Sequence, residues 1–110
     1  FVGRGMTTHV QDMSVIGNPL VAGESELVVS VFLPEITRIS VNLYSVSGYL
    51  VRKLCSPSLE SGNWSIAWDG TNDYDQLVKA GVYILRIIVE DPQSGEKFLH
   101  SVMVGVNKRN

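Results

Sequence analysis

The fold class of this chain is decided by residues 64–83, WSIAWDGTNDYDQLVKAGVY. Apolar residues alternate with small or polar ones from Trp64 to Trp68, which is the period of a β-strand with one buried face. Asp69-Gly70 supplies residues that tolerate turn conformations, and a second alternating run begins at Gly81. We therefore expect two strands of a β-hairpin, joined by a long polar loop.

The size and composition of the chain fit one domain. It has 110 residues, 45% of them hydrophobic, which is enough apolar material for a single core without disulfides. Lysine and arginine number 9 against 11 aspartates and glutamates, so the net charge is −2 and no basic field attracts nucleic acid or anionic lipid. No apolar run approaches the roughly 20 residues of a membrane-spanning helix. We expect neither a nucleic-acid partner nor membrane insertion.

The two ends of the chain are expected to lie outside the folded domain. The sequence begins with Phe1 and carries no signal-peptide pattern, so we interpret it as a piece of a longer protein whose export signal would lie upstream. We expect a linker or frayed segment over residues 1–12, the folded domain over 13–106, and a C-terminal tail over 107–110.

Period-two alternation recurs along the chain, whereas helical spacing is not sustained in any long window. Strands are expected at residues 13–16, 27–33, 39–44, 49–54, 64–68, 81–90 and 97–106. Pro34 is expected to end the second of these because it lacks an N–H group. Ser47-Gly48 and Asp91–Gly95 supply hairpin turns. The pattern predicts an all-β fold, an immunoglobulin- or fibronectin-III-like antiparallel β-sandwich of about seven strands.

Several residues have a spacing that is typical of one family. They are Asn18-Pro19, then Val41, Leu43, Tyr44, Gly48 and Val51, then Trp68-Asp69-Gly70, Asp73, Val78 and Gly81-Val82-Tyr83. On these residues the chain resembles the FlgD-type Ig-like module, named for the C-terminal region of the flagellar hook-capping protein and found at the ends of many secreted bacterial proteins. Ser45 and Asp75 depart from the family pattern, which usually has Asp and Gly there. Because Asp tolerates positive φ less well than Gly, we expect an altered loop backbone at Asp75.

The resemblance implies a non-catalytic module with a structural, attachment or assembly role in an exported, extracytoplasmic bacterial protein. The expected partner is a neighbouring domain of the same parent chain or another protein subunit, and no cofactor is implied. The motif residues are expected to have structural roles, namely Asn18, Pro19, Tyr44, Gly48, Trp68, Asp69, Gly70, Asp73, Gly81 and Tyr83.

Two other functions remain open. One is a C-terminal sorting signal similar to the type IX secretion domains, which share the Gly-x-Tyr strand and a terminal lysine. The other is an accessory carbohydrate-binding module that uses the aromatic residues. Trp68-Asp69-Gly70 and its long loop fit the FlgD-type pattern better than the sorting pattern.

The polar loop contains candidate calcium ligands. Asp69, Asn72, Asp73 and Asp75 carry oxygen atoms of the kind that calcium prefers. The twelfth position from Asp69 is Ala80, however, where an EF-hand needs a bidentate glutamate. Turn-stabilising hydrogen bonds explain the same residues, and we favour that interpretation.

No catalytic residues are predicted. His9 and His100 lie far apart in the sequence, and no nucleophile motif surrounds them or Cys55. His100 alternates with apolar neighbours and is expected to be partly buried, and Cys55 is expected to pack at a strand end.

The aromatic residues have a packing interpretation as well. Trp64, Trp68 and Tyr83 could form a sugar-stacking platform, but their alternation with polar residues favours inward packing. Asn63-Trp64-Ser65 matches the N-glycosylation pattern, a short motif that arises often by chance.

Overall fold

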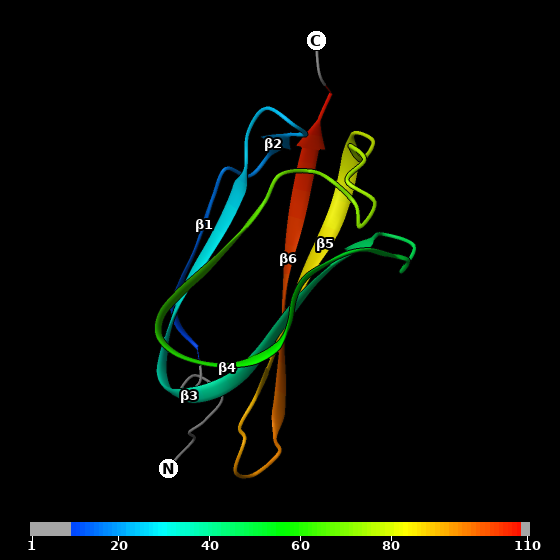
Figure 1. Cartoon of the computed structure of the whole chain (residues 1–110). Helices are drawn as coiled ribbons and strands as arrows, with labels where there is room; N and C mark the ends of the chain where they lie inside the picture. Colours follow the sequence, from blue (N-terminus) through cyan, green and yellow to red (C-terminus); the bar gives the residue numbers. More distant parts are fainter. Residues whose placement is uncertain (1–9, 109–110) are drawn as a thin grey trace.

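The chain is all-β, as predicted. The computed structural model describes residues 10–108 (Figure 1), and no helix occurs among them. No described segment is a helix long and apolar enough to cross a bilayer. The strands are β1 (Gln11–Ile16), β2 (Leu20–Val21), β3 (Leu27–Ser45), β4 (Leu50–Trp68), β5 (Gly81–Glu90) and β6 (Lys97–Asn107). Residues 1–9 of the expected N-terminal segment and residues 109–110 of the expected tail lie outside the described residues, so the domain limits stay a prediction.

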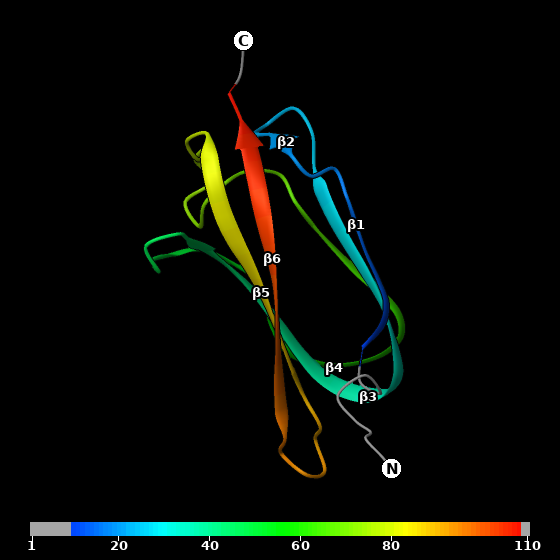
Figure 2. The same ribbon diagram turned by 180° about the vertical axis from the view of Figure 1, so that it is seen from behind.

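One hydrogen-bonded sheet folds over on itself to make two layers. The strand order is β1-β3-β5-β6-β2, with β4 paired to β3, and every pair is antiparallel except β2 with β6. β3 and β4 bend together at the lower end of the molecule (Figures 1 and 2). The first half of β3 therefore pairs with β1 and the end of β4, and its second half pairs with β5 and the start of β4.

The core lies between these two layers. Alternate residues of β3 and β5 point inward, which is the pattern that the sequence predicts for strands with one buried face. The fully buried aliphatic side chains of these two strands are Leu27, Val29, Val31, Leu33, Ile39, Val41, Leu43, Leu85, Ile87 and Val89.

Pro34 does not end a strand, and this prediction was wrong. The expected strands 27–33 and 39–44 are one strand, β3, whose ladder to β4 is interrupted between Leu33 and Thr37. Pro34 lies in this interruption, where a missing N–H costs no ladder bond. Thr37 is buried at the bend, and its hydroxyl donates to the carbonyl oxygen of Glu35 at 2.9 Å. The bend is therefore an ordered corner between the two layers, stabilised by the buried Thr37 and its hydrogen bond.

The hairpin predicted for residues 64–83 was also wrong. β4 and β5 do not pair with each other, because each pairs with a different part of β3. The expected strands 49–54 and 64–68 are likewise one strand, β4, and the short β2 was not expected. The predicted turns at Ser47-Gly48 and Asp91–Gly95 are confirmed, since β3–β4 and β5–β6 are antiparallel neighbours across them.

Candidate functional site

The polar loop between β4 and β5 is a small hairpin of its own, residues 70–78. Thr71 and Leu77 form an antiparallel bridge, and the Asn72 N–H donates to the Gln76 carbonyl at 2.9 Å. Asp75 takes φ +60°, the left-handed conformation that ends a three-residue hairpin turn. Asp75 thus adopts the positive-φ conformation for which glycine is suited. The aspartate that replaces the usual glycine of the family therefore strains the backbone at this position.

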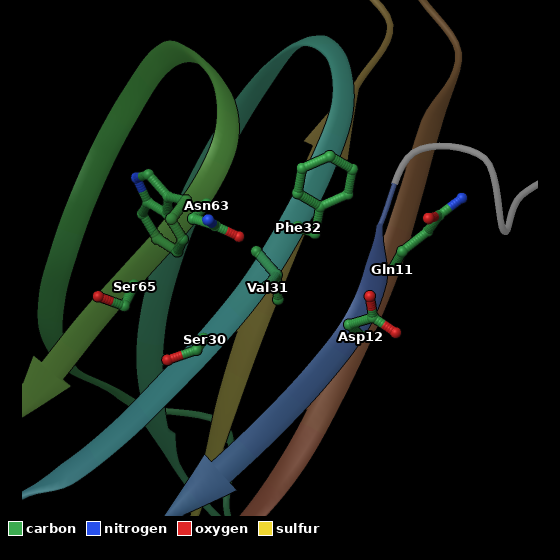
Figure 3. A pocket seen from close by; sticks show the side chains of 8 residues that line it. Gln11, Asp12, Ser30, Val31, Phe32, Asn63 and Ser65 are labelled. Atoms are coloured by element: carbon green, nitrogen blue, oxygen red, sulfur yellow. The ribbon is translucent and has the colours of Figure 1, made fainter.

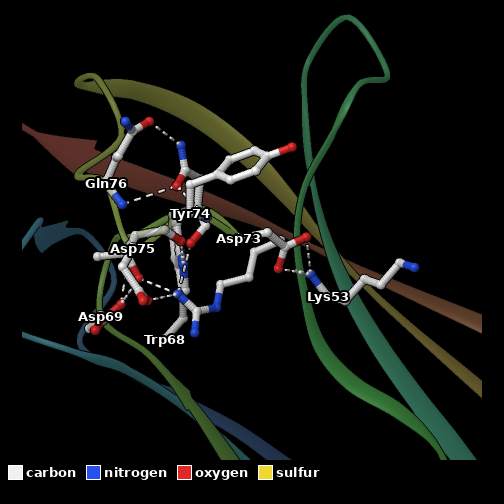
Figure 4. A network of polar contacts seen from close by, with 10 residues as sticks. Lys53, Trp68, Asp69, Asp73, Tyr74, Asp75 and Gln76 are labelled. Carbon is white, nitrogen blue, oxygen red and sulfur yellow. Dashed lines mark hydrogen bonds and ion pairs between the residues drawn. The ribbon is translucent and has the colours of Figure 1, made fainter.

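Asn72 holds the turn of the 70–78 hairpin together. Its side-chain oxygen accepts hydrogen bonds from the Tyr74 N–H at 2.8 Å and the Gln76 N–H at 3.0 Å, and its amide nitrogen donates to the Gln76 side chain at 3.3 Å (Figure 4). These are Asx-type contacts, in which the side chain replaces a backbone partner.

Arg52 fastens the 70–78 hairpin to β4. Its guanidinium donates to the Thr71 hydroxyl and to the Asn72 carbonyl, the latter at 2.9 Å, and lies 3.6 Å from the Asp75 carboxylate. Arg52 was not among the predicted site residues, because no sequence signal pairs a strand residue with a loop 20 positions later. Within residues 10–108, Arg52 is the one cation that contacts three members of the hairpin.

Asp73 covers part of the free edge of β4. Its N–H donates to the Val51 carbonyl at 3.2 Å, and its carboxylate accepts from the Lys53 N–H at 3.1 Å (Figure 4). A single residue therefore occupies the place of a neighbouring strand.

Asn18 does the same for β6. Its side-chain amide donates to the Met103 carbonyl at 2.9 Å, and its side-chain oxygen accepts from the Gly105 N–H at 3.0 Å. We call Asn18 and Asp73 the edge caps, because each satisfies two backbone groups that an unpaired strand would expose.

Trp68 connects the 70–78 hairpin to the core. Its side chain is 1% exposed, its indole N–H donates to the Thr71 carbonyl at 2.8 Å, and its ring meets Tyr83 edge-on at 5.8 Å. The Tyr83 hydroxyl donates to the Lys79 carbonyl at 2.6 Å, and burial raises the pKa of that hydroxyl. The predicted burial of Trp68 is confirmed, while Tyr83 is half-buried.

Asp69 and Gly70 fix the approach of the hairpin to the core. The hydrogen bond from the Thr71 hydroxyl lowers the pKa of Asp69 most, the Thr71 N–H and the charge of Arg52 lower it further, and partial burial opposes them. Gly70 has φ +87°, and a Cβ there would lie 2.6 Å from Ala22. Only glycine fits this position without displacing Ala22.

The candidate calcium ligands face different partners. The side-chain oxygens of Asp69, Asn72, Asp73 and Asp75 are directed to Thr71, to the hairpin turn, to Lys53 and to Arg52, respectively. No group of three or more His, Cys, Asp or Glu side chains in residues 10–108 could hold a metal ion. The geometry therefore supports the turn-stabilising interpretation.

His100 and Cys55 are too far apart to act together. They lie in one row across the sheet, Cys55 beside Val41 and His100 beside Ile87, with β3 and β5 between them. Three strand spacings place their Cα atoms about 14 Å apart. Both residues are half-buried, and the Cys55 thiol contacts the Ser56 carbonyl at 3.2 Å. His9 lies outside the described residues.

The three aromatic residues form no exposed platform. Trp64 packs against the core, as does Tyr83, and Trp68 is buried. An open hollow of about 540 Å³ lies instead across β1, β3 and the end of β4 (Figure 3). Its lining residues are Gln11, Asp12, Ser30, Val31, Phe32, Asn63, Trp64 and Ser65.

The sequence matches one family model over most of the described core. Residues 17–92 match the FlgD Ig-like domain. This chain belongs to the FlgD Ig-like domain family. The suspected resemblance is thereby confirmed, and the match includes both edge caps and the 70–78 hairpin. No curated protein matches the chain.

Two solved structures are similar to this chain, and the first of them shares its fold. One is dimeric latent PorU from Porphyromonas gingivalis, with a TM-score of 0.62 and 22% identity over 87% of this chain and 9% of PorU. The other is PorZ, a surface component of the type IX secretion system of the same organism, with a TM-score of 0.49 and 21% identity over 87% of this chain and 11% of PorZ. The chain thus spans about a tenth of the length of these proteins.

Proposed function

We propose that this chain is a non-catalytic Ig-like module of a larger exported bacterial protein, in which it serves a structural, attachment or assembly role. The observation that carries the proposal is the use of the polar motif residues. Asn18, Asp69 and Asp73 each bond to backbone or side-chain groups of the domain itself. Groups used in this way stabilise a fold and are not available to act on a substrate.

The proposed location is extracytoplasmic, and the proposed partner is a neighbouring domain of the parent chain or another subunit. The family resemblance supports the location. The small share of PorU that this fold occupies supports a role as one part of a large protein. A rigid sandwich suits such a role because it presents fixed surfaces and strand edges to a neighbour.

The experiment that tests the proposal is deletion of residues 18–110 from the parent protein. We expect export to continue while assembly or stability of the parent is lost. Loss of export would favour the type IX sorting function instead, and loss of glycan retention with normal assembly would favour carbohydrate binding. A parent that carries Tyr74→Ala, a change at an 82% exposed side chain, is the control that keeps the fold.

A further inference from the structure

The layer that contains the second half of β3 with β5 and β6 has an apolar outer face (Figure 1). In each of these strands the residues that alternate with the buried ones point away from the core. The β3–β5 and β5–β6 ladders have no register shift, so the outward side chains form continuous rows across the three strands. We call six large outward residues the apolar face, namely Tyr44, Val82, Ile84, Ile88, Leu99 and Met103.

The apolar face is accessible to water. Met103 lies beside Ile84 in the ladder, and Leu99 lies beside Ile88. The exposed fractions are 45% for Val82, 56% for Leu99 and 69% for Met103. Soluble domains seldom leave large apolar side chains together on one surface, and such a patch is typical of a contact with another protein surface.

The outer face of the other layer has a different composition. This layer pairs β1 with the first half of β3 and the end of β4. One row there is apolar and lies at one end, with Ile16, Val28 and Ala67. Two further rows are mainly polar, with Ser14, Ser30 and Ser65 in one and Gln11, Phe32 and Asn63 in the next. The layer of β5 and β6 therefore offers the larger apolar surface.

A positive charge stands at the centre of the apolar face. Arg86 lies on β5 between Ile84 and Ile88, and its two neighbours across the ladder are uncharged. Its guanidinium lies over the Tyr44 ring, 5.0 Å from the ring centroid. Its Nε atom is buried without a hydrogen-bond partner, and no ion pair joins Arg86 to an acid among residues 10–108.

A surface that covers the apolar face must therefore bring a carboxylate to Arg86. Covering a guanidinium without a partner is costly, and a charge-assisted hydrogen bond to a carboxylate offsets that cost. Glu90 lies on the same side of β5, but its carboxylate pairs with Arg38 at 3.4 Å. The complementary surface is apolar and carries an aspartate or glutamate of its own.

A second copy of this chain fits the apolar face poorly. Two copies stacked face to face would bring two Arg86 guanidinium groups together in apolar surroundings, where like charges repel strongly. The face is also small, since three strands and four rows cover about 14 Å by 20 Å, or about 300 Å². Separate proteins that associate stably bury about 800 Å² on each partner, whereas contacts between domains of one chain begin at about 600 Å² in total. A domain tethered by the same chain needs less area, because the tether keeps its effective concentration high.

We propose that a neighbouring domain of the same parent protein docks on the apolar face, with an aspartate or glutamate of that domain paired with Arg86. The proposal rests on the proposed function and deepens it, because it names the docking surface and the chemistry of the partner. The ion pair at the centre fixes the position of the contact, and the apolar residues around it exclude water.

The first test measures thiol labelling in the parent protein, which carries Cys55→Ser with either Met103→Cys or Ser65→Cys. Ser65 is the control, because it is exposed on the outer face of the other layer. Mass spectrometry of the labelled peptide gives each rate with a maleimide, and division by the rate in concentrated urea removes differences in intrinsic reactivity. We expect position 103 to be labelled at least about tenfold more slowly than position 65, because labelling there requires the domains to separate.

Changes at Arg86 and Leu99 in the Met103→Cys parent test the chemistry of the contact. Arg86→Met leaves the carboxylate of the neighbour without its partner and should raise the labelling rate at position 103 at least about threefold. Arg86→Lys keeps the charge and should raise that rate less. Leu99→Asp adds a carboxylate at a 56% exposed position, where the fold tolerates it, and should also raise the rate. Thermal unfolding of the parent checks that each variant folds.

The second test identifies the covering surface. Light-activated p-benzoylphenylalanine substituted for Met103 in the parent should cross-link within one molecule, to a peptide outside these 110 residues that contains Asp or Glu. Equal labelling at positions 103 and 65 would overturn the proposal, as would cross-links to a second copy, to a different protein or to residues 1–9. Slow labelling that Arg86→Met does not change would overturn the assigned ion pair. Each of these results leaves the proposed function standing, since deletion in the parent tests it separately.

Discussion

Replacement of Trp68 by alanine should remove most of the stability of this domain. Trp68 is 1% exposed, and truncating a buried tryptophan costs about 3–5 kcal/mol. The Thr71 carbonyl also loses its donor at 2.8 Å, and Tyr83 loses its edge contact, each worth about 1 kcal/mol. These effects overlap, so we expect about 4–5 kcal/mol in total. Domains of this size are stable by about 5–15 kcal/mol, so the variant should be marginal or unfolded.

Urea unfolding followed by circular dichroism measures this loss, since a lower midpoint at constant slope reports stability alone. Trp68→Phe separates the loss of core packing from the loss of the hydrogen bond to the Thr71 carbonyl. It keeps an aromatic ring in the core and removes the donor to Thr71, so we expect a cost of about 1.5–3 kcal/mol. Tyr74→Ala is the control, because its side chain is 82% exposed and should change stability by less than about 0.5 kcal/mol. A loss below about 1 kcal/mol for Trp68→Ala would refute the role of this residue as the anchor of the hairpin.

Four further outcomes are expected. Gly70→Ala should destabilise the domain by about 2–5 kcal/mol in urea unfolding, because the added Cβ would lie 2.6 Å from Ala22. Gly48→Ala, whose Cβ would meet nothing within 4 Å, should cost only about 1–2 kcal/mol of backbone strain, and equal effects of the two variants would contradict this account. Asp75→Gly should raise the melting temperature by about 2–4 °C, because the relief of the left-handed backbone strain exceeds the cost of the greater entropy of glycine in the unfolded chain. The lost ion pair with Arg52 is exposed and contributes little, and a lower melting temperature would contradict this prediction. The Thr71 hydroxyl lowers the folded-state pKa of Asp69 below 3.8, so the stability that ionised Asp69 adds is complete above that pH and is lost as the pH falls through the folded-state pKa. Asp69→Asn should therefore reduce the loss of unfolding free energy at acid pH, and an unchanged pH dependence would contradict the assignment. Millimolar calcium or chelator should leave the melting temperature nearly unchanged, and a rise of many degrees with calcium would show a site that the hairpin contacts do not reveal.

The sequence predicts the strands of this domain better than it predicts their partners. Alternation identifies which residues face the core, and Leu27, Val41 and Leu85 are buried as expected. Alternation carries no information on pairing, however. The two long strands were therefore read as four, and the stretch 64–83 was read as a hairpin although β4 and β5 both pair with β3.

The loop shows the same division between local and distant information. The turn contacts of Asn72 and Asp69 involve residues within four positions, and turn chemistry predicts them. The contacts of Asp73 with Lys53 and of Asn18 with Gly105 span 20 and 87 positions. They depend on the bend of β3 and β4, which no local pattern reports, and Arg52 was missed for the same reason.

The edge caps explain how a motif of scattered polar residues can be a structural signature. Asn18 bonds to the edge of β6 and Asp73 bonds to the edge of β4, so each completes the hydrogen bonding of one strand. Their loss would expose strand backbone to pairing. Such residues stabilise a domain and limit the surfaces through which it can associate.

The most direct test of the central proposal, a non-catalytic role for this module, is an activity measurement on the purified chain. A panel of generic ester, peptide and glycoside substrates is incubated with the chain and with a Cys55→Ser, His100→Ala variant, because Cys55 and His100 are its described thiol and imidazole. We predict no turnover that differs between the two proteins. Hydrolysis by the unchanged chain that the double variant lacks, while remaining folded by circular dichroism, would contradict the account.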